Sequence, residues 1–280
     1  MIPSESGLVF SVLLNYRTIT DNPQDRAPHK DEIDAARILS NCSSEQLLDF
    51  EDFLNAQGLS LHIIDGLDIG IPPKPSLSNK FYILIRKRGT DPAAFFDQRW
   101  FIEGMRDKRK ERGEDSLENS RVDTIFWFTR LWLSLQWFFY EKISRQPSQV
   151  SRYDRALVLG DNFVKVVSDG IEAMGNKGRP DDEAGVMYDV LWKGRTQIKT
   201  WVKRFLRTME QAGVIEETRI PGEYKQSLAA AVDMAMIAER ELAYLMPPTG
   251  EDNIMSRSVM LLTGAPLPVE VKRGDSNASD

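Results

Sequence analysis

Apolar residues recur at helical spacing through most of this chain, and alternating runs that suit strands are few and short. The densest apolar run lies between residues 122 and 143, VDTIFWFTRLWLSLQWFFYEKI. Because apolar side chains occupy most of its circumference, this run predicts a helix that is covered on most sides. We interpret it as a central core helix. The alternative is a helix partly covered by another subunit, with Trp127, Trp137 and Tyr140 as interface anchors.

Residues 1–90 show three helical patterns followed by strand patterns. The third helix begins with a capping-box spacing at Ser43 and Gln46 and ends at Gly58. Its expected inward contacts are apolar: Leu47, Leu48, Phe50, Phe53 and Leu54. Strands are predicted at 59–64 and 67–71, joined by a turn at Asp65–Gly66, and a further strand is predicted at 81–86.

Three helices followed by a hairpin is an order that resembles the winged-helix superfamily. The resemblance implies that the third helix would occupy the position of a DNA-reading helix. That helix is acidic, with Glu45, Asp49, Glu51 and Asp52, and such a face would be repelled by phosphate. We therefore expect residues 1–90 to bind protein or to support the fold.

Residues 91–120 are predicted to be a helical and charged connector. A basic run from Arg106 to Arg112 is followed by the acidic residues Glu114, Asp115 and Glu118. We interpret this run as a solvated loop. A loop that contacts phosphate is the alternative, since clustered Lys and Arg give salt-dependent binding.

Residues 121–246 are predicted to form a helical domain, with a long helix at 153–174 and another that begins at Asp181–Glu183. The most regular amphipathic pattern follows, with these inward positions: Ile198, Trp201, Val202, Phe205, Leu206 and Met209. A strand is predicted at 214–220, a turn at Pro221–Gly222 and a returning strand at 223–226, and an alanine-rich helix is predicted at 225–246. Residues 181–227 therefore also resemble a winged helix.

The other face of that amphipathic helix is basic, and no acidic residue occurs between Lys193 and Met209. The candidate nucleic-acid-binding residues are Lys193, Arg195, Gln197, Lys199, Thr200, Lys203, Arg204 and Arg207. Arg195 and Gln197 are placed to reach base edges, and the later Lys and Arg residues suit phosphate contacts. A solvated helix surface and a surface for an acidic protein partner are the alternatives.

Composition narrows the function classes. The single cysteine, Cys42, cannot form an internal disulfide, and the N-terminus lacks the basic region of a secretory signal. A cytoplasmic location is therefore expected. The two histidines, His29 and His62, are far apart, and no catalytic, metal-binding or cofactor-binding motif is present. We expect a protein that is not an enzyme and needs neither metal nor cofactor.

Residues 247–280 are predicted to be a flexible tail. Met260 and Leu261 belong to an apolar patch in this tail that could dock on a neighbouring chain, either another subunit or a second copy.

The sequence thus predicts a mainly α protein with short β-hairpins, built as two winged-helix-like regions around a central aromatic helix. The resemblance implies a non-catalytic, DNA-associated subunit of a bacterial complex. That complex would handle chromosomes or plasmids, as SMC-type machines do, or would act in defence. One alternative is a sequence-specific DNA-binding regulator or replication initiator. The other is a structural or interaction protein that binds no nucleic acid.

Overall fold

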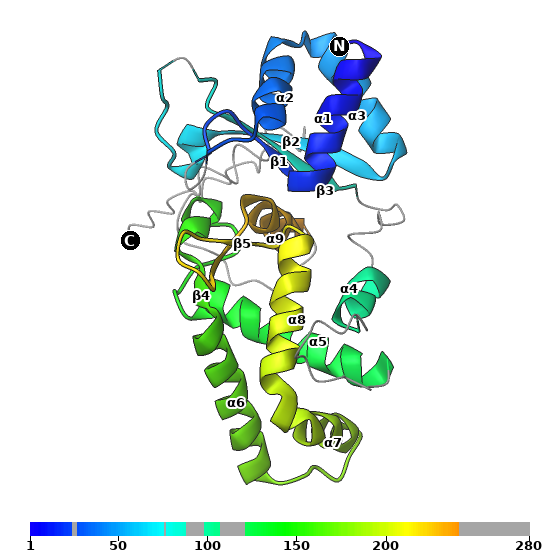
Figure 1. The fold of residues 1–280 in the computed structure, drawn as a ribbon, viewed down its shortest axis with the longest axis vertical. Helices are drawn as coiled ribbons and strands as arrows, with labels where there is room; N and C mark the ends of the chain where they lie inside the picture. Colours follow the sequence, from blue (N-terminus) through cyan, green and yellow to red (C-terminus); the bar gives the residue numbers. More distant parts are fainter. Residues whose placement is uncertain (24–26, 76, 88–97, 107–120, 241–280) are drawn as a thin grey trace, which may run out of the picture.

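The computed structural model of this protein describes residues 1–23, 27–75, 77–87, 98–106 and 121–240. These residues form mainly α-helices with two small antiparallel sheets of three strands each, which confirms the predicted mainly α class with short β-hairpins. The molecule is elongated, with the N-terminal helices and sheet at one end and α6 and α7 at the other (Figure 1). The predicted tail, 247–280, and most of the predicted connector, 91–120, lie outside the described residues.

The N-terminal region packs three helices on one face of the first sheet. Its elements are α1 (Pro3–Tyr16), β1 (Thr18–Ile19), α2 (Lys30–Asn41), α3 (Ser44–Ala56), β2 (Leu59–Asp65) and β3 (Lys80–Arg86). The strand order is β1-β3-β2, with antiparallel pairing throughout. Apolar side chains of the three helices and of this sheet face form one buried cluster, which includes Leu13, Ala36, Leu54 and Tyr82.

The predicted ends of α3 are confirmed. Ser43 is the N-cap: its side chain accepts a hydrogen bond from the Gln46 amide, and its own amide donates one to the side-chain oxygen of Gln46. Gly58, just after the helix, has a φ of 73°, a conformation that glycine adopts without steric cost.

The strand predicted at 67–71 is wrong. Asp65 accepts a hydrogen bond from the Leu67 amide and starts a 3-10 helix, η1 (Gly66–Ile69). The backbone of Gly66 then bonds to Asn79, which folds the following loop back. The partner of β2 is therefore β3, in a register that runs from Leu59 opposite Arg86 to Asp65 opposite Lys80.

The C-terminal region contains the second sheet and the longer helices. Its helical elements are α4 (Gln98–Met105), α5 (Arg121–Gln136), the π-helical turn η3 (Trp137–Glu141), the 3-10 helix η4 (Val150–Arg155), α6 (Gly160–Lys177), α7 (Ala184–Lys193), the 3-10 helix η5 (Gly194–Gln197), α8 (Ile198–Gln211) and α9 (Leu228–Arg240). Its strands are β4 (Leu157–Leu159), β5 (Ile215–Glu217) and β6 (Glu223–Gln226), in the order β4-β6-β5.

The single helix predicted at 153–174 is also wrong. Residues 157–159 form β4 instead, which pairs with β6 so that Val158 lies opposite Tyr224. Val158 is buried in the core while Leu157 and Leu159 face outward. The helix α6 begins only at Gly160.

The aromatic helix α5 is a core helix, as interpreted from its pattern. Together with η3 it contributes five buried side chains to the largest core cluster: Trp127, Leu131, Leu135, Phe138 and Phe139. The rings of Trp127 and Trp201 are stacked, with centroids 5.4 Å apart. This contact joins α5 to α8, so the two central helices share one core.

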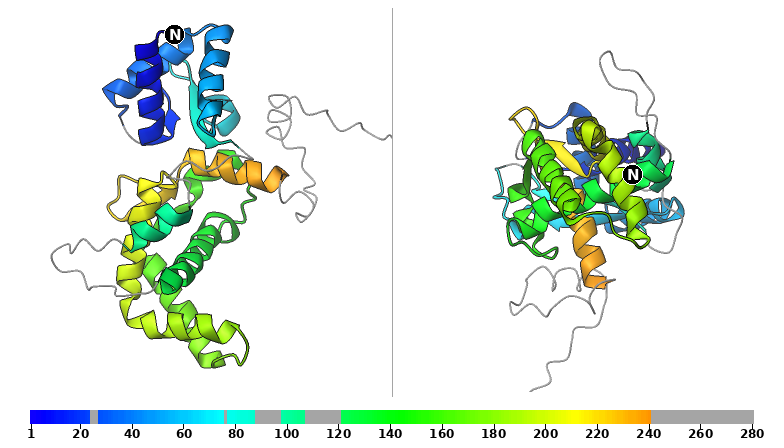
Figure 2. Two further views of the ribbon diagram at one scale, coloured as in Figure 1. Left: turned by 90° about the vertical axis from the view of Figure 1, so that its right-hand side faces the viewer. Right: turned by 90° about the horizontal axis from the view of Figure 1, so that it is seen from below.

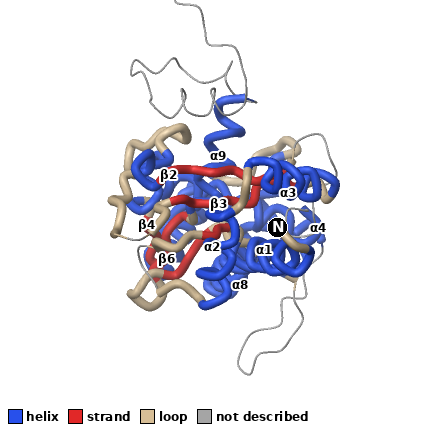
Figure 3. The backbone as a smooth tube through the Cα atoms, turned by 90° about the horizontal axis from the view of Figure 1, so that it is seen from above, coloured by secondary structure: helices blue, strands red, loops and turns tan. Residues whose placement is uncertain are grey.

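A third apolar cluster connects the two regions. The face of the first sheet that α1 to α3 leave uncovered, with Phe81, Ile83 and Ile85, packs against α9 and η4. Small side chains at Ala229 and Ala231 allow this close approach. Figures 1 and 2 show α9 lying directly beneath the first sheet, between the two regions. Figure 3, viewed from above, shows the strands of both sheets in red, with β4 and β6 to one side of α1 and α2.

Candidate nucleic-acid interface

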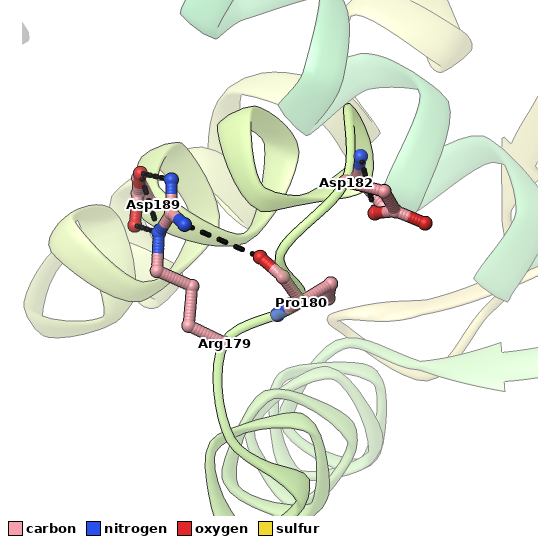
Figure 4. A network of polar contacts seen from close by, with 5 residues as sticks. Arg179, Pro180, Asp182 and Asp189 are labelled. Carbon is pink, nitrogen blue, oxygen red and sulfur yellow. Dashed lines mark hydrogen bonds and ion pairs between the residues drawn. The ribbon is translucent and has the colours of Figure 1, made fainter.

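The candidate interface begins at α7, whose start follows from the local sequence. The Asp182 carboxylate accepts a hydrogen bond from the Ala184 amide, which fits the predicted helix start. Arg179 donates to both carboxylate oxygens of Asp189, at 2.9–3.1 Å, and to the carbonyl oxygen of Pro180 (Figure 4). These bonds hold the pKa of Asp189 below its usual value and fasten the turn onto α7.

Glycine allows the chain to continue closely packed from α7 into α8. A Cβ atom added at Gly194 would lie 2.7 Å from Nε1 of Trp127. The short helix η5 therefore passes directly over the buried tryptophan. This close passage fixes where Lys193 and Arg195 emerge at the surface.

The predicted inward face of α8 is confirmed, since all six apolar positions are buried. Phe205 contacts Phe163 of α6 and Phe128 of α5 through its ring. The orientation of α8 is thus set from two sides, and the directions of its polar side chains follow from it.

Most of the predicted basic residues lie at the surface. Lys193, Arg195, Lys199 and Lys203 are exposed, and Gln197, Thr200 and Arg207 are half-buried. They come from the last residue of α7, from η5 and from the outward side of α8. The structure therefore places seven of the eight predicted residues on consecutive elements with some exposure to solvent, and we call these seven residues the basic surface.

Arg204 does not belong to the basic surface, which corrects its prediction as a phosphate contact. The residue is 4% exposed, and its Nη1 atom points to the carbonyl oxygen of Met105 in α4, at 3.4 Å. Helix α4 packs on this side of α8, and Gly104 approaches the side chain of Thr208. Arg204 therefore joins α8 to α4.

Arg195 is exposed, but its guanidinium is held against α7. Its carbon Cζ lies 4.2 Å from the ring centroid of Trp192, and Nη1 donates a hydrogen bond to the Trp192 carbonyl oxygen at 2.8 Å. Trp192 in turn stacks on Tyr188. A base contact by Arg195 would have to break this arrangement.

The C-terminal end of α8 has the opposite charge. Glu210, Glu216 and Glu217 are exposed there, on α8 and on β5. Partial desolvation of its carboxyl group, together with the nearby charge of Glu217, raises the pKa of Glu210. Burial and the same two carboxylates, Glu210 and Glu217, also raise the pKa of Tyr224. The basic surface is therefore confined to the last residue of α7, to η5 and to the part of α8 before Thr208.

The residues predicted at a protein interface lie in different environments. Trp127 is 1% exposed inside the core, so its prediction as an interface residue is wrong: Trp201 and Gly194 cover its ring. Trp137 is 42% exposed, and Tyr140 is half-buried and accepts a hydrogen bond from Gln226. Met260 and Leu261 lie outside the described residues.

Sequence reasoning missed two exposed apolar residues on α3. Leu48 is 61% exposed and Phe53 is 44% exposed, although both were expected to point inward. The spacing of the apolar residues along α3 could have predicted this exposure. Leu47, Phe50 and Leu54 already fill one face at i, i+3 and i+7, so Leu48 and Phe53 must project from its edges.

Comparisons with protein-family models, with curated proteins and with solved structures find no match to this chain. Among the described residues, no group of three or more His, Cys, Asp or Glu side chains could hold a metal ion. Within the same ranges, no helix has both the length and the apolar character that crossing a membrane requires.

Proposed function

We propose that this protein is a non-catalytic, DNA-associated subunit of a cytoplasmic bacterial complex, and that its basic surface contacts the DNA backbone. The observation that carries the proposal is the placement of Lys193, Arg195, Lys199 and Lys203 at the surface of consecutive elements, with no acid between Lys193 and Met209. Lys and Arg side chains bind duplex DNA by neutralising phosphates and releasing counterions.

The order of the elements supports a winged-helix interpretation of both regions. In each region a helix precedes a first strand, further helices follow, and two antiparallel strands end the unit. The first strand pairs with the third in both sheets. In the second region α8 immediately precedes the β5–β6 hairpin, the position of a DNA-reading helix in that superfamily. The additional helix α7, between α6 and α8, departs from the simple pattern.

The environment of Arg195 favours backbone contact over sequence-specific readout. Base recognition in the major groove requires side chains that are available to donate to base edges. The Arg195 guanidinium is stacked on Trp192 and bonded to its carbonyl oxygen. The remaining basic residues are mostly lysines, which act at phosphates as point charges without reading sequence. We therefore do not adopt the regulator or initiator alternative.

The proposal is tested by the salt dependence of binding to a generic DNA duplex. Five basic side chains on this surface predict a slope of log affinity against log salt of at most about −4.5, at about −0.9 per phosphate. Changing both Lys199→Gln and Lys203→Gln should reduce the magnitude of the slope by about 1.8. Urea unfolding of the variant would show whether its stability is preserved.

The matched control is Lys74→Gln with Lys80→Gln, two exposed lysines of the N-terminal region. This control removes the same charge from the molecule and should leave both affinity and slope unchanged. Equal weakening by both pairs would indicate a general charge effect and would contradict the proposed site. Absence of binding at low salt would exclude the DNA-binding function.

A further inference from the structure

The outward face of α3 combines acidic and apolar residues. Positions at i, i+3, i+4, i+7, i+8 and i+11 are all exposed, and they are Glu45, Leu48, Asp49, Asp52, Phe53 and Ala56. A solvent-facing helical stripe is normally polar. Here an exposed leucine and an exposed phenylalanine lie among three carboxylates.

The apolar part of this face continues onto α1. The ring of Phe53 meets the ring of Phe10 edge-on, with centroids 5.2 Å apart. Leu14, one turn after Phe10, is exposed. Gly7, one turn before Phe10, has open space around it, because a Cβ atom added there would meet nothing within 4 Å. Together, Gly7, Phe10 and Leu14 of α1 and the six exposed residues of α3 form what we call the acidic-apolar surface.

The charge of this surface restricts what can bind to it. α1 and α3 contain no lysine or arginine, whereas α3 contains four acidic residues. DNA would be repelled by them. A second copy that used the same surface in a symmetric contact would bring carboxylates opposite carboxylates. A basic partner is the complementary choice.

We propose that the acidic-apolar surface binds a basic amphipathic segment of a partner protein. The apolar side chains of that segment would cover Leu48 and Phe53, and its Lys or Arg residues would pair with Glu45, Asp49 and Asp52. Helix-in-groove recognition combines apolar anchors with flanking charges in this way. The inference rests on the part of the proposed function that makes this chain a complex subunit, and it does not depend on DNA binding.

The test uses a labelled amphipathic peptide of about 15 residues, long enough to form a helix on binding. Leucines occupy one face of the peptide and lysines flank them, and a second peptide has glutamates in place of the lysines. Fluorescence anisotropy with the full-length protein should show binding of the lysine peptide only. Leu48→Ser should weaken this binding about tenfold, the effect of losing one anchor residue.

Asp49→Lys with Asp52→Lys should weaken binding by at least about tenfold as well. Two controls are matched to these changes. Leu67→Ser replaces another exposed leucine of the same region, and Asp169→Lys with Glu172→Lys reverses two exposed acids with the same spacing on α6. Both controls should retain the affinity of the unmodified protein.

Equal binding of the two peptides, no binding of the lysine peptide, or equal effects of controls and test variants would each overturn the proposal. Sedimentation that showed a dimer lost in Leu48→Ser would assign the surface to a second copy and would overturn it too. A parallel DNA titration separates this inference from the DNA-binding proposal. The α3 variants should bind DNA undiminished, and Lys199→Gln with Lys203→Gln should still bind the peptide.

Discussion

Arg17 and Asp233 form an ion pair, with Nη2 and Oδ2 2.5 Å apart, that joins the end of α1 to α9. Arg17 is buried, has a left-handed backbone with a φ of 58°, and also donates to the carbonyl oxygen of Leu84 in β3. The pair therefore lies where the first sheet packs on α9. It adds a charged contact to the apolar cluster that connects the two regions.

We predict that Asp233→Ala lowers the free energy of unfolding by about 2–3 kcal/mol, because it removes the carboxylate partner of a buried guanidinium. Urea unfolding checks this value. The control is Asp34→Ala, which removes the exposed ion pair with Arg37 within α2 and should cost less than about 1 kcal/mol. Equal losses would mean that the Arg17–Asp233 pair contributes no more than a surface pair.

Gly194→Ala should destabilise the largest core cluster, which contains Trp127 and Trp201. The added Cβ atom would lie 2.7 Å from the Trp127 indole nitrogen, so the stacked pair Trp127–Trp201 would have to shift. Overpacking of this kind costs about 1–3 kcal/mol. Urea unfolding, with tryptophan fluorescence as the probe, would report both the stability and the altered environment of the rings.

Gly7→Ala is the matched substitution and should act in the opposite direction. Gly7 lies within α1 and has nothing within 4 Å of an added Cβ atom. Alanine there should stabilise the protein by about 0.5–1 kcal/mol, since glycine loses more conformational freedom in a helix. If both substitutions destabilise the protein equally, the close passage at Gly194 is not what determines the cost.

Local signals in the sequence predicted the ends of α3 and the buried face of α8, but they predicted the strand pairing poorly. The Ser43–Gln46 capping box and Gly58 fix the ends of α3 through contacts within a few residues, so the sequence reveals them. The loop that returns the chain from β2 to β3 is closed by the hydrogen bond from the Gly66 amide to the Asn79 carbonyl oxygen, between residues 13 positions apart. The three-residue strand β4 depends on pairing with β6, far along the chain. The choice of a distant strand partner is not encoded in the local apolar periodicity, so the sequence pattern did not predict it.

In the candidate site, too, features set within one helix were predicted from the sequence, and features set by a distant element were not. Periodicity correctly predicted the buried face of α8, and with it the exposure of Lys199 and Lys203. It could not show that α4 covers part of the opposite face and buries Arg204. Amphipathicity assumes one covered face, and a second packed helix is visible only in the tertiary structure.

Tyr140 provides a test of pH dependence. Burial raises the pKa of its hydroxyl above the ordinary value of 10.0, while the hydrogen bond from Gln226 and the charge of Arg145 oppose the rise. The folded protein therefore holds this proton more tightly than the unfolded chain does. The resulting stability is fully present below pH 10 and is lost as the pH rises from 10 through the raised pKa.

Tyr140→Phe should lower the free energy of unfolding at pH 8 by about 1 kcal/mol, because the amide of Gln226 loses its acceptor. Above pH 10 the difference from the unmodified protein should narrow, since the variant has no phenol to ionise at this position. Urea unfolding of the variant and of the unmodified protein, at pH 8 and above pH 10, measures the difference in unfolding free energy at each pH. A gap that widens above pH 10 would contradict the direction of the shift.

Lys203 and Arg204 are adjacent in the sequence but point to different surroundings, so their substitution should have opposite consequences. Lys203→Gln changes an exposed residue and should weaken DNA binding and reduce the magnitude of the salt slope by about 0.9. The free energy of unfolding of the Lys203→Gln variant should differ from that of the unmodified protein by less than about 0.5 kcal/mol.

Arg204→Gln should lower the free energy of unfolding by about 1–3 kcal/mol, because it removes a buried guanidinium that α4 and α8 share. The affinity of the folded protein for DNA, measured well below the unfolding transition, should stay unchanged. The two variants have the same net charge, so any difference between them reports position alone. If Arg204→Gln reduces the salt slope as much as Lys203→Gln does, Arg204 reaches phosphate and α4 must leave this face of α8 when DNA binds.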